Sequence, residues 1–185
     1  MPRPPLNSCV HTDMAMVLTV KFTSADYEAL AENFPIELIE GRFIRDPSPA
    51  YGHQRIVGNV FSPVRRHVGR SRAVVSPIDV FLGEHNVLQP DILVLDRPLG
   101  PKTKHAELPA LVVEVLSPST IRRDRQVKRR IYLEAGVREV WIVDPESETV
   151  EIFTRSGQRS FGLDDPLESA VVPEFRLPPR SLLRE

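Results

Sequence analysis

The stretch that decides the fold is Leu111-Val112-Val113-Glu114-Val115-Leu116. Its nearly continuous apolar character is typical of a short strand that is buried on both faces of a sheet. Glu114 stands in the middle of this strand, where an unpaired carboxylate costs several kcal/mol even after the structure relaxes. We therefore expect Glu114 to have a cation, a Lys or Arg partner, or a proton, unless its side chain points off a sheet edge into water.

A second acid stands at the head of another apolar run. Asp91 follows Pro90 and leads directly into Ile92-Leu93-Val94-Leu95. A Pro-Asp pair alone is a common turn and carries little information. Together with Glu114, however, it makes two carboxylates on two core strands, which can meet at one end of the sheet. Such a pair binds a hard divalent cation such as Mg²⁺ or Mn²⁺ and leaves positions for water and phosphate.

A basic helix is predicted over residues 119–135, with Ser119 or Thr120 as its N-cap and Gly136 as its stop. It carries six basic residues against two acidic ones, a charge of +4, whereas the formal net charge of the whole chain is −1. Arginines present planar groups with several donors, which suit a phosphate backbone. A run of arginines is nevertheless more often a solvated helix face.

Two stripes of side chains follow this helix at i, i+4 and i+8 spacing. The predicted core stripe is Val127, Ile131 and Ala135, and the adjoining stripe is Asp124, Lys128 and Tyr132. Lys128 then lies at the border of the buried face, from which it can reach toward the strand end that carries Glu114. The alternative is a solvated Asp124–Lys128 pair, which contributes about 0.3–0.5 kcal/mol.

The rest of the chain alternates short helices and strands. Helices are predicted over residues 25–32, after Thr23-Ser24, and over 51–68, where Pro63 should kink or split the second helix. The remaining predicted elements are a hairpin over 36–46 with its turn at Glu40-Gly41, strands at 73–82, 88–95, 140–143 and 150–154, and a short C-terminal helical turn. This order indicates a mixed α/β or α+β sheet in a single domain over residues 16–185, after a flexible tail over residues 1–15.

Composition excludes several classes of protein. With 185 residues, 41% hydrophobic and 26% charged, the chain has an ordinary globular composition rather than a disordered or fibrous one. The net charge excludes a uniformly basic nucleic-acid coat but not a local basic patch. The single cysteine, Cys9, allows no internal disulfide and no cysteine-based zinc site, and together with the lack of a signal-like segment it favours the cytoplasm. No apolar run approaches the roughly 20 residues of a membrane span.

The order of these motifs resembles the Uma-two family, which is classed with restriction endonucleases and is similar in fold to the PD-(D/E)XK nucleases. The resemblance is carried by LQPDILVLD (88–96), PALVVEVLSPST (109–120), the stripe of Asp124, Lys128 and Tyr132, GVREVWIVDP (136–145) and, upstream, IELIEGRF (36–43) and PSPAYGHQ (47–54). It covers roughly residues 20–155 and implies a restriction-endonuclease-like mixed β-sheet flanked by helices.

The resemblance also implies a metal site. Asp91 and Glu114 would hold Mg²⁺ or Mn²⁺, and Glu37 would complete the metal shell unless it is simply an exposed hairpin acid. The usual nuclease carries a lysine two residues after the second acid, but this chain has Leu116 there. Lys128 is therefore the candidate for a lysine that is supplied from the helix instead.

Substrate contacts are implied as well. His53 would contact the substrate, unless it is a capping or core histidine. The other implied substrate-binding residues are Arg122, Arg125, Arg129 and Tyr132. The implied reaction is metal-assisted hydrolysis of DNA phosphodiester bonds, in which Lys128 orients the attacking water or stabilises charge in the transition state. A homodimer follows only by analogy with the fold class.

Two other interpretations stay open. The chain can be a catalytically inactive nucleic-acid-binding or protein-interaction module on the same fold, and the displaced lysine is the feature that favours this. Alternatively, the acids and the basic helix form only an internal ion-pair network.

Overall fold

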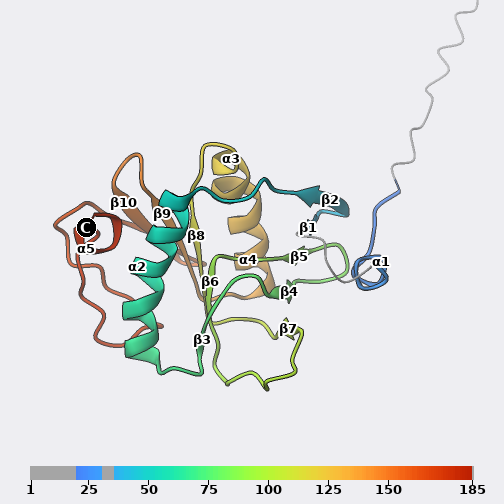
Figure 1. The fold of residues 1–185 in the computed structure, drawn as a ribbon, viewed down its shortest axis with the longest axis horizontal. Helices are drawn as coiled ribbons and strands as arrows, with labels where there is room; N and C mark the ends of the chain where they lie inside the picture. The colour runs from blue at the N-terminus through green and yellow to red at the C-terminus, as the bar shows by residue number, and fades with distance from the viewer. Residues whose placement is uncertain (1–19, 31–35, 185) are drawn as a thin grey trace, which may run out of the picture.

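The computed structural model describes residues 20–30 and 36–184. The predicted tail over residues 1–15, with Cys9, lies outside the described residues. The described chain forms two β-sheets with helices packed around them (Figure 1). This mixed arrangement of helices and strands confirms the fold class predicted from the sequence.

The larger sheet has six strands in the order β11-β10-β9-β8-β6-β3. Its strands are β3 (Ala73–Val75), β6 (Ile92–Val94), β8 (Leu111–Val115), β9 (Glu139–Asp144), β10 (Thr149–Thr154) and β11 (Gly157–Phe161). β8 and β9 run parallel, and the other neighbouring pairs are antiparallel. β8 lies between β6 and β9 inside the sheet, and every residue of β8 is buried, as its apolar sequence predicts.

The smaller sheet has five strands in the order β2-β1-β5-β4-β7. Its strands are β1 (Ile36–Ile39), β2 (Arg42–Arg45), β4 (Asp79–Phe81), β5 (Val87–Leu88) and β7 (His105–Ala106). β1 and β2 form the predicted hairpin, and its two turn residues, Glu40 and Gly41, both have positive φ angles, of 51° and 80°. Two positive φ angles are what a tight two-residue hairpin turn requires, and glycine adopts them without a steric cost.

Two apolar runs that the sequence presents as single strands are each divided between the two sheets. Residues 73–82 form β3 in the larger sheet and β4 in the smaller one, and residues 88–95 are divided between β5 and β6. Pro77 and Pro90 lie at the two breaks, and a proline cannot donate a backbone hydrogen bond to a sheet. The second break leaves Asp91 at the junction of the two sheets.

The helices α1 (Ser24–Glu28), α2 (Tyr51–Val68) and α5 (Arg180–Leu183) lie outside the sheets. α2 begins and ends where predicted, and it continues through Pro63, which corrects the prediction of a split helix. Pro63 is buried on the apolar face of α2, so burial of its ring offsets the loss of one backbone hydrogen bond. α1 is shorter than predicted, and a capping box between Thr23 and Asp26 sets its start. No helix in these described residues has the length and apolar character needed to cross a bilayer.

The predicted basic helix forms in three parts: α3 (Ile121–Arg123), a π-helical turn η1 (Asp124–Lys128) and α4 (Arg129–Ala135). Gly136 ends it in a left-handed conformation, as predicted, with a φ angle of 110°.

The π turn changes which side chains of this helix face inward. Hydrogen bonds from i to i+5 widen the turn and rotate the residues around it. Asp124, Lys128 and Tyr132 are consequently buried, whereas Val127 and Ala135 are only half-buried. The predicted core stripe is confirmed, because Ile131 is buried in the core and Val127 and Ala135 pack against it. The polar stripe is buried beside it, more deeply than the border position that the sequence predicts.

Two apolar cores lie on opposite faces of the larger sheet. In β8, Val113 and Val115 belong to the core beneath α2, whereas Val112 belongs to the core beneath α4. Because side chains alternate along a strand, Glu114 faces the α4 side together with Val112. Glu114 thus points toward the buried polar stripe of the basic helix, which consists of Asp124, Lys128 and Tyr132.

Candidate active site

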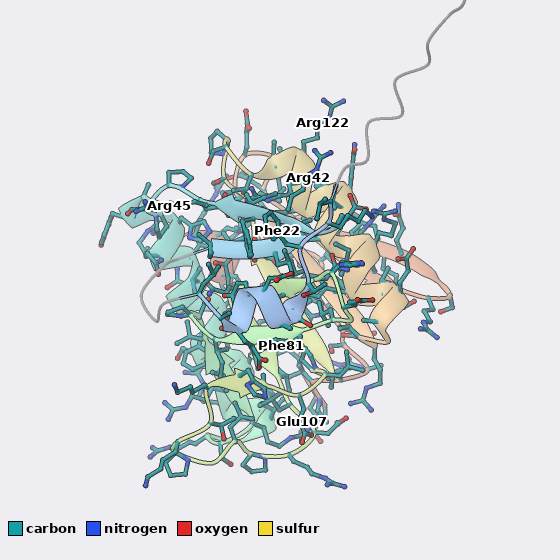
Figure 2. All side chains as sticks on the ribbon, turned by 90° about the vertical axis from the view of Figure 1, so that its right-hand side faces the viewer. Phe22, Arg42, Arg45, Phe81, Glu107 and Arg122 are labelled. Atoms are coloured by element: carbon teal, nitrogen blue, oxygen red, sulfur yellow. The ribbon has the colours of Figure 1, made fainter. Side chains whose placement is uncertain are left out.

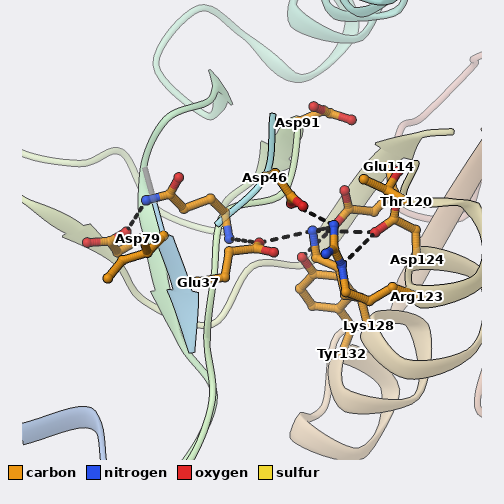
Figure 3. A network of polar contacts seen from close by, with 12 residues as sticks. Glu37, Asp46, Asp79, Asp91, Glu114, Thr120, Arg123, Asp124, Lys128 and Tyr132 are labelled. Carbon is orange, nitrogen blue, oxygen red and sulfur yellow. Dashed lines mark hydrogen bonds and ion pairs between the residues drawn. The ribbon is translucent and has the colours of Figure 1, made fainter. Parts of the chain in front are cut away.

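A cleft of about 640 Å³ lies between the β1–β2 hairpin, the beginning of α2 and the segment from β8 to η1. Five of the residues singled out from the sequence line it: Glu37, His53, Asp91, Glu114 and Lys128. They come from separate elements of both sheets and two helices. Figure 3 shows the polar contacts that join Lys128 to Glu37, Glu114 and Asp124.

Glu114 lies on β8, and Asp91 directly precedes the neighbouring strand β6 at the same end of the larger sheet. β6 and β8 pair antiparallel with Ile92 opposite Val113, so one further step of this register sets Asp91 opposite Glu114. The backbone N–H of Val115 donates a hydrogen bond of 2.8 Å to Oδ2 of Asp91, which holds this carboxylate at the strand end. Both acids thus lie at this end of the larger sheet and line the same cleft.

Glu114 is 3% exposed, and its Oε1 accepts two hydrogen bonds from the helix that covers it. Nζ of Lys128 lies at 2.9 Å and the hydroxyl of Tyr132 at 2.6 Å from this oxygen. Burial raises the pKa of Glu114 well above its ordinary value; the Lys128 ammonium lowers it, and the charges of Asp124, Asp91 and Glu37 raise it further. Glu114 is the point at which the strand and the basic helix are joined.

Lys128 lies between three carboxylates and is 3% exposed. Its Nζ is 3.0 Å from Oε1 of Glu37, 2.9 Å from Oε1 of Glu114 and 3.8 Å from Oδ1 of Asp124 (Figure 3). Burial alone would lower the pKa of Lys128, but these carboxylates raise it well above its ordinary value, so the amine carries its charge. The alternative of a solvated Asp124–Lys128 pair is therefore wrong.

The donor set fits a hard divalent cation held by two carboxylates. In the part of the chain that the structure describes, no three acidic, histidine or cysteine side chains surround one point closely enough to hold a metal. Mg²⁺ commonly takes only one or two protein carboxylates and keeps several waters, and Asp91 and Glu114 supply two at one cleft wall. Oε2 of Glu37 is buried without a hydrogen-bond partner among the described residues, so it is a further oxygen that a cation would satisfy.

The comparisons with known proteins agree with this fold. The model of the Uma2 family, described as "Putative restriction endonuclease", matches residues 24–180. This chain belongs to the Uma2 family. A solved structure from Anabaena variabilis ATCC 29413, described as "a putative nuclease belonging to DUF820", is similar to it, with 23% identity and a TM-score of 0.75 over 88% of this chain and 97% of that chain. That similarity shows the fold. A search of curated proteins found no match.

His53 lies in the wall of the Uma2 cleft beside Asp91. Its Nε2 is 2.9 Å from the carbonyl oxygen of Val115 and 3.4 Å from Oδ2 of Asp91. The contact with Asp91 raises the pKa of His53 above its ordinary value, although burial opposes this. Its Nδ1 is buried without a partner among the described residues. His53 thus contacts both Asp91 and the end of β8. It also lines the cleft.

Tyr132 is not accessible from the cleft of this Uma2 structure, which is contrary to the substrate contact implied by the resemblance. It is completely buried, it does not line the cleft, and its hydroxyl donates to Glu114. Burial and the neighbouring carboxylates raise its pKa well above the ordinary value, so the hydroxyl keeps its proton. Tyr132 therefore orients Glu114 rather than a ligand.

The three arginines predicted to hold phosphates do not line the cleft. Arg125 forms ion pairs with Asp144, at 2.7 Å, and with Glu151. The guanidinium of Arg129 lies over the ring of Phe153, 4.4 Å from its centroid. Arg122 extends into solvent at the edge of the molecule (Figure 2). The periodicity of the helix could not show that Arg125 forms ion pairs with carboxylates from β9 and β10.

Two functional candidates were missed by the sequence reasoning. Arg123 lines the cleft, where Asp46 holds its guanidinium at 2.6 Å. Asp124, which the sequence places in the polar stripe beside Lys128 without a role in the site, is buried and lines the same cleft. The spacing of four residues between Asp124 and Lys128 was a usable signal, but the π turn that directs both side chains inward has no signature in the sequence.

Proposed function

We propose that this Uma2 protein is a Mg²⁺- or Mn²⁺-dependent endonuclease that hydrolyses phosphodiester bonds in DNA. The observation that carries this proposal is that Asp91 and Glu114 line one cleft and that the ammonium of Lys128 lies 2.9 Å from Glu114. Two carboxylates can hold the cation that metal-assisted phosphodiester hydrolysis uses, and a charged lysine can stabilise the negative charge of its transition state. Membership of the Uma2 family supports a nuclease.

Asp91 and Glu114 would hold the cation, with Glu37 as a further oxygen donor. When bound, such a cation supplies Lewis-acid chemistry, because it neutralises charge on the phosphate and eases deprotonation of the attacking water. Lys128 keeps a fixed positive charge at the acids, where negative charge develops in the transition state. Arg123, at the same cleft, would bind a phosphate oxygen of the substrate.

A second candidate function is a binding module without catalysis. It is favoured by Leu116, which occupies the position where the related nucleases carry a lysine, and by the ammonium of Lys128, which already lies between Glu37 and Glu114. In such a module the acids and the lysine would form only an internal ion-pair network, and DNA would bind without being cut.

A plasmid-nicking assay separates these functions. Wild-type protein is incubated with supercoiled plasmid and Mg²⁺ or Mn²⁺, with EDTA as the metal-free arm, beside Asp91→Ala, Glu114→Ala and the control Arg138→Ala, whose exposed ion pair with Asp96 lies outside the cleft. We expect cleavage that EDTA, Asp91→Ala and Glu114→Ala each abolish and Arg138→Ala preserves. DNA binding without any cleavage would establish the binding module instead.

A cytoplasmic location and a homodimer remain predictions.

A further inference from the structure

The ammonium of Lys128 occupies the space between two of the carboxylates that the proposed function assigns to a cation. Its Nζ is nearly equidistant from Oε1 of Glu37, at 3.0 Å, and Oε1 of Glu114, at 2.9 Å. A divalent cation bound to Glu114 would therefore face a fixed positive charge at hydrogen-bonding distance from the same carboxylate. Like charges at such a separation inside a protein repel each other strongly, because little water screens them.

Asp124 offers a second place for this ammonium. Its Oδ1 lies 3.8 Å from Nζ of Lys128, is buried, and has no hydrogen-bond partner among the residues the structure describes. A side-chain hydrogen bond from Thr120 holds the carboxylate, and Nε of Arg123 stands 3.9 Å from the same free oxygen. Buried acceptors are rarely left unsatisfied, because the loss of their hydration is costly. A small movement of the Lys128 ammonium toward Oδ1 of Asp124 would give this oxygen the hydrogen bond that it lacks.

The lysine side chain can make the movement that this requires. Lysine carries its charge on a flexible four-carbon stem with rotatable donors, so a small change of its torsion angles shifts Nζ without moving the backbone. The helix provides the geometry, because the π turn η1 places Asp124 and Lys128 on the same inward face. The move exchanges Glu37 for Asp124 as an acceptor, so the ammonium stays paired with a carboxylate throughout.

We propose that Asp124 is a positioning residue that accepts the ammonium of Lys128 when a divalent cation binds at Asp91 and Glu114. This inference rests on the proposed function, because it needs a cation at these acids. In the metal-free protein Lys128 neutralises Glu37 and Glu114, and in the metal-bound protein it turns toward Asp124 and remains beside the site.

The test is a double-mutant cycle on Mn²⁺ affinity, measured by isothermal titration calorimetry on the full chain. The variants are Asp124→Asn, Lys128→Met, both together, and Asp96→Asn, which makes the same carboxylate-to-amide change at an exposed position outside the cleft. We expect Lys128→Met to tighten Mn²⁺ binding and Asp124→Asn to weaken it, each by about tenfold. The effect of Asp124→Asn should vanish in the Lys128→Met background, and Asp96→Asn should change nothing.

Two results of the cycle would overturn the inference. If Asp124→Asn weakens binding equally with and without Lys128, Asp124 acts on the cation itself and not through the lysine. If Lys128→Met does not tighten binding, the ammonium does not compete with the cation.

A crystal structure of the wild-type protein with Mn²⁺ gives a second measurement, which is needed because Lys128→Met leaves buried carboxylates unpaired and can fail to fold. Nζ of Lys128 within hydrogen-bonding distance of Oδ1 of Asp124 supports the inference, and an Nζ that stays between Glu37 and Glu114 beside a bound Mn²⁺ overturns it. If the wild-type protein binds Mn²⁺ and nicks DNA while Lys128 stays between Glu37 and Glu114, this inference fails and the proposed function stands. If neither the wild type nor Lys128→Met binds Mn²⁺, the proposed function fails as well.

Discussion

Nζ of Lys128 lies 2.9 Å from Oε1 of Glu114, although the lysine comes from a helical turn and the glutamate from the centre of a buried strand. Residues two positions apart on a strand share a face, so a lysine at position 116 would reach the same space. Leu116 fills that position and packs in the core beneath α4. The positive charge comes instead from Lys128 in the π turn η1, which packs on the same face of the sheet as Leu116.

The Lys128–Glu114 contact should matter for stability as well as for cleavage. We expect Lys128→Ala to lower the free energy of unfolding by about 3–5 kcal/mol at neutral pH, because it strands buried carboxylates without a partner. Urea denaturation measures this change. The matched control is Arg130→Ala, which removes an exposed ion pair with Glu40 and should cost less than about 1 kcal/mol. Equal losses in the two variants would show that Lys128 is not the centre of the buried network.

Tyr132 should affect the rate of cleavage but not the binding of DNA. Tyr132→Phe removes the hydroxyl that orients Glu114, so we expect kcat in the nicking assay to fall by about 10–100-fold. The KM for DNA should stay unchanged, because Tyr132 does not line the cleft. Tyr27→Phe is the control, since it deletes a hydroxyl that bonds Asp79 away from the cleft. If Tyr132→Phe raises KM and leaves kcat unchanged, Tyr132 contacts the substrate, as the resemblance implies.

Arg123 should replace the three predicted arginines as the phosphate contact of the cleft. We expect Arg123→Ala to weaken binding of a short DNA duplex and to reduce the slope of log affinity against log salt by about 1, measured by fluorescence anisotropy. Arg125→Ala should leave that slope unchanged and instead destabilise the fold, because its partners are Asp144 and Glu151. A change of slope in Arg125→Ala alone would contradict this assignment.

The contact of His53 with Asp91 should appear in the pH dependence of stability. Asp91 raises the pKa of His53 above its ordinary value of 6.5, so the folded protein binds this proton more tightly than the unfolded chain. The resulting stabilisation is present in full below pH 6.5 and is lost as the pH rises through the folded pKa. The difference in unfolding free energy between wild type and His53→Gln should therefore shrink above pH 6.5. In an Asp91→Asn background this pH dependence should disappear, and its persistence there would mean that another group causes it.

Much of the architecture follows from local patterns. The β1–β2 hairpin, both ends of α2, the buried strand β8 and the stop at Gly136 were predictable because glycine turns, helical period and apolar runs act within a few residues. Asp91 and Glu114 could be found for a related reason: an acid in or beside an apolar strand is expensive wherever that strand lies.

Other features could not be predicted, because they depend on contacts between distant segments. The apolar runs that begin at Ala73 and Leu88 are divided between two sheets by pairing partners that no local pattern specifies. Arg125 looks like a free cation in the sequence, and its acidic partners come from β9 and β10.

The sequence by itself determined which residues are candidates for the chemistry: two acids in or beside core strands and a lysine four residues after an aspartate. Only the tertiary structure decided what surrounds them. The helix that contains the π turn buries Asp124, Lys128 and Tyr132 against the sheet, where Lys128 and Tyr132 contact Glu114. Rotation of a helix and pairing of strands are set by packing over the whole domain, so the same residues become a buried charge network rather than a solvated helix face.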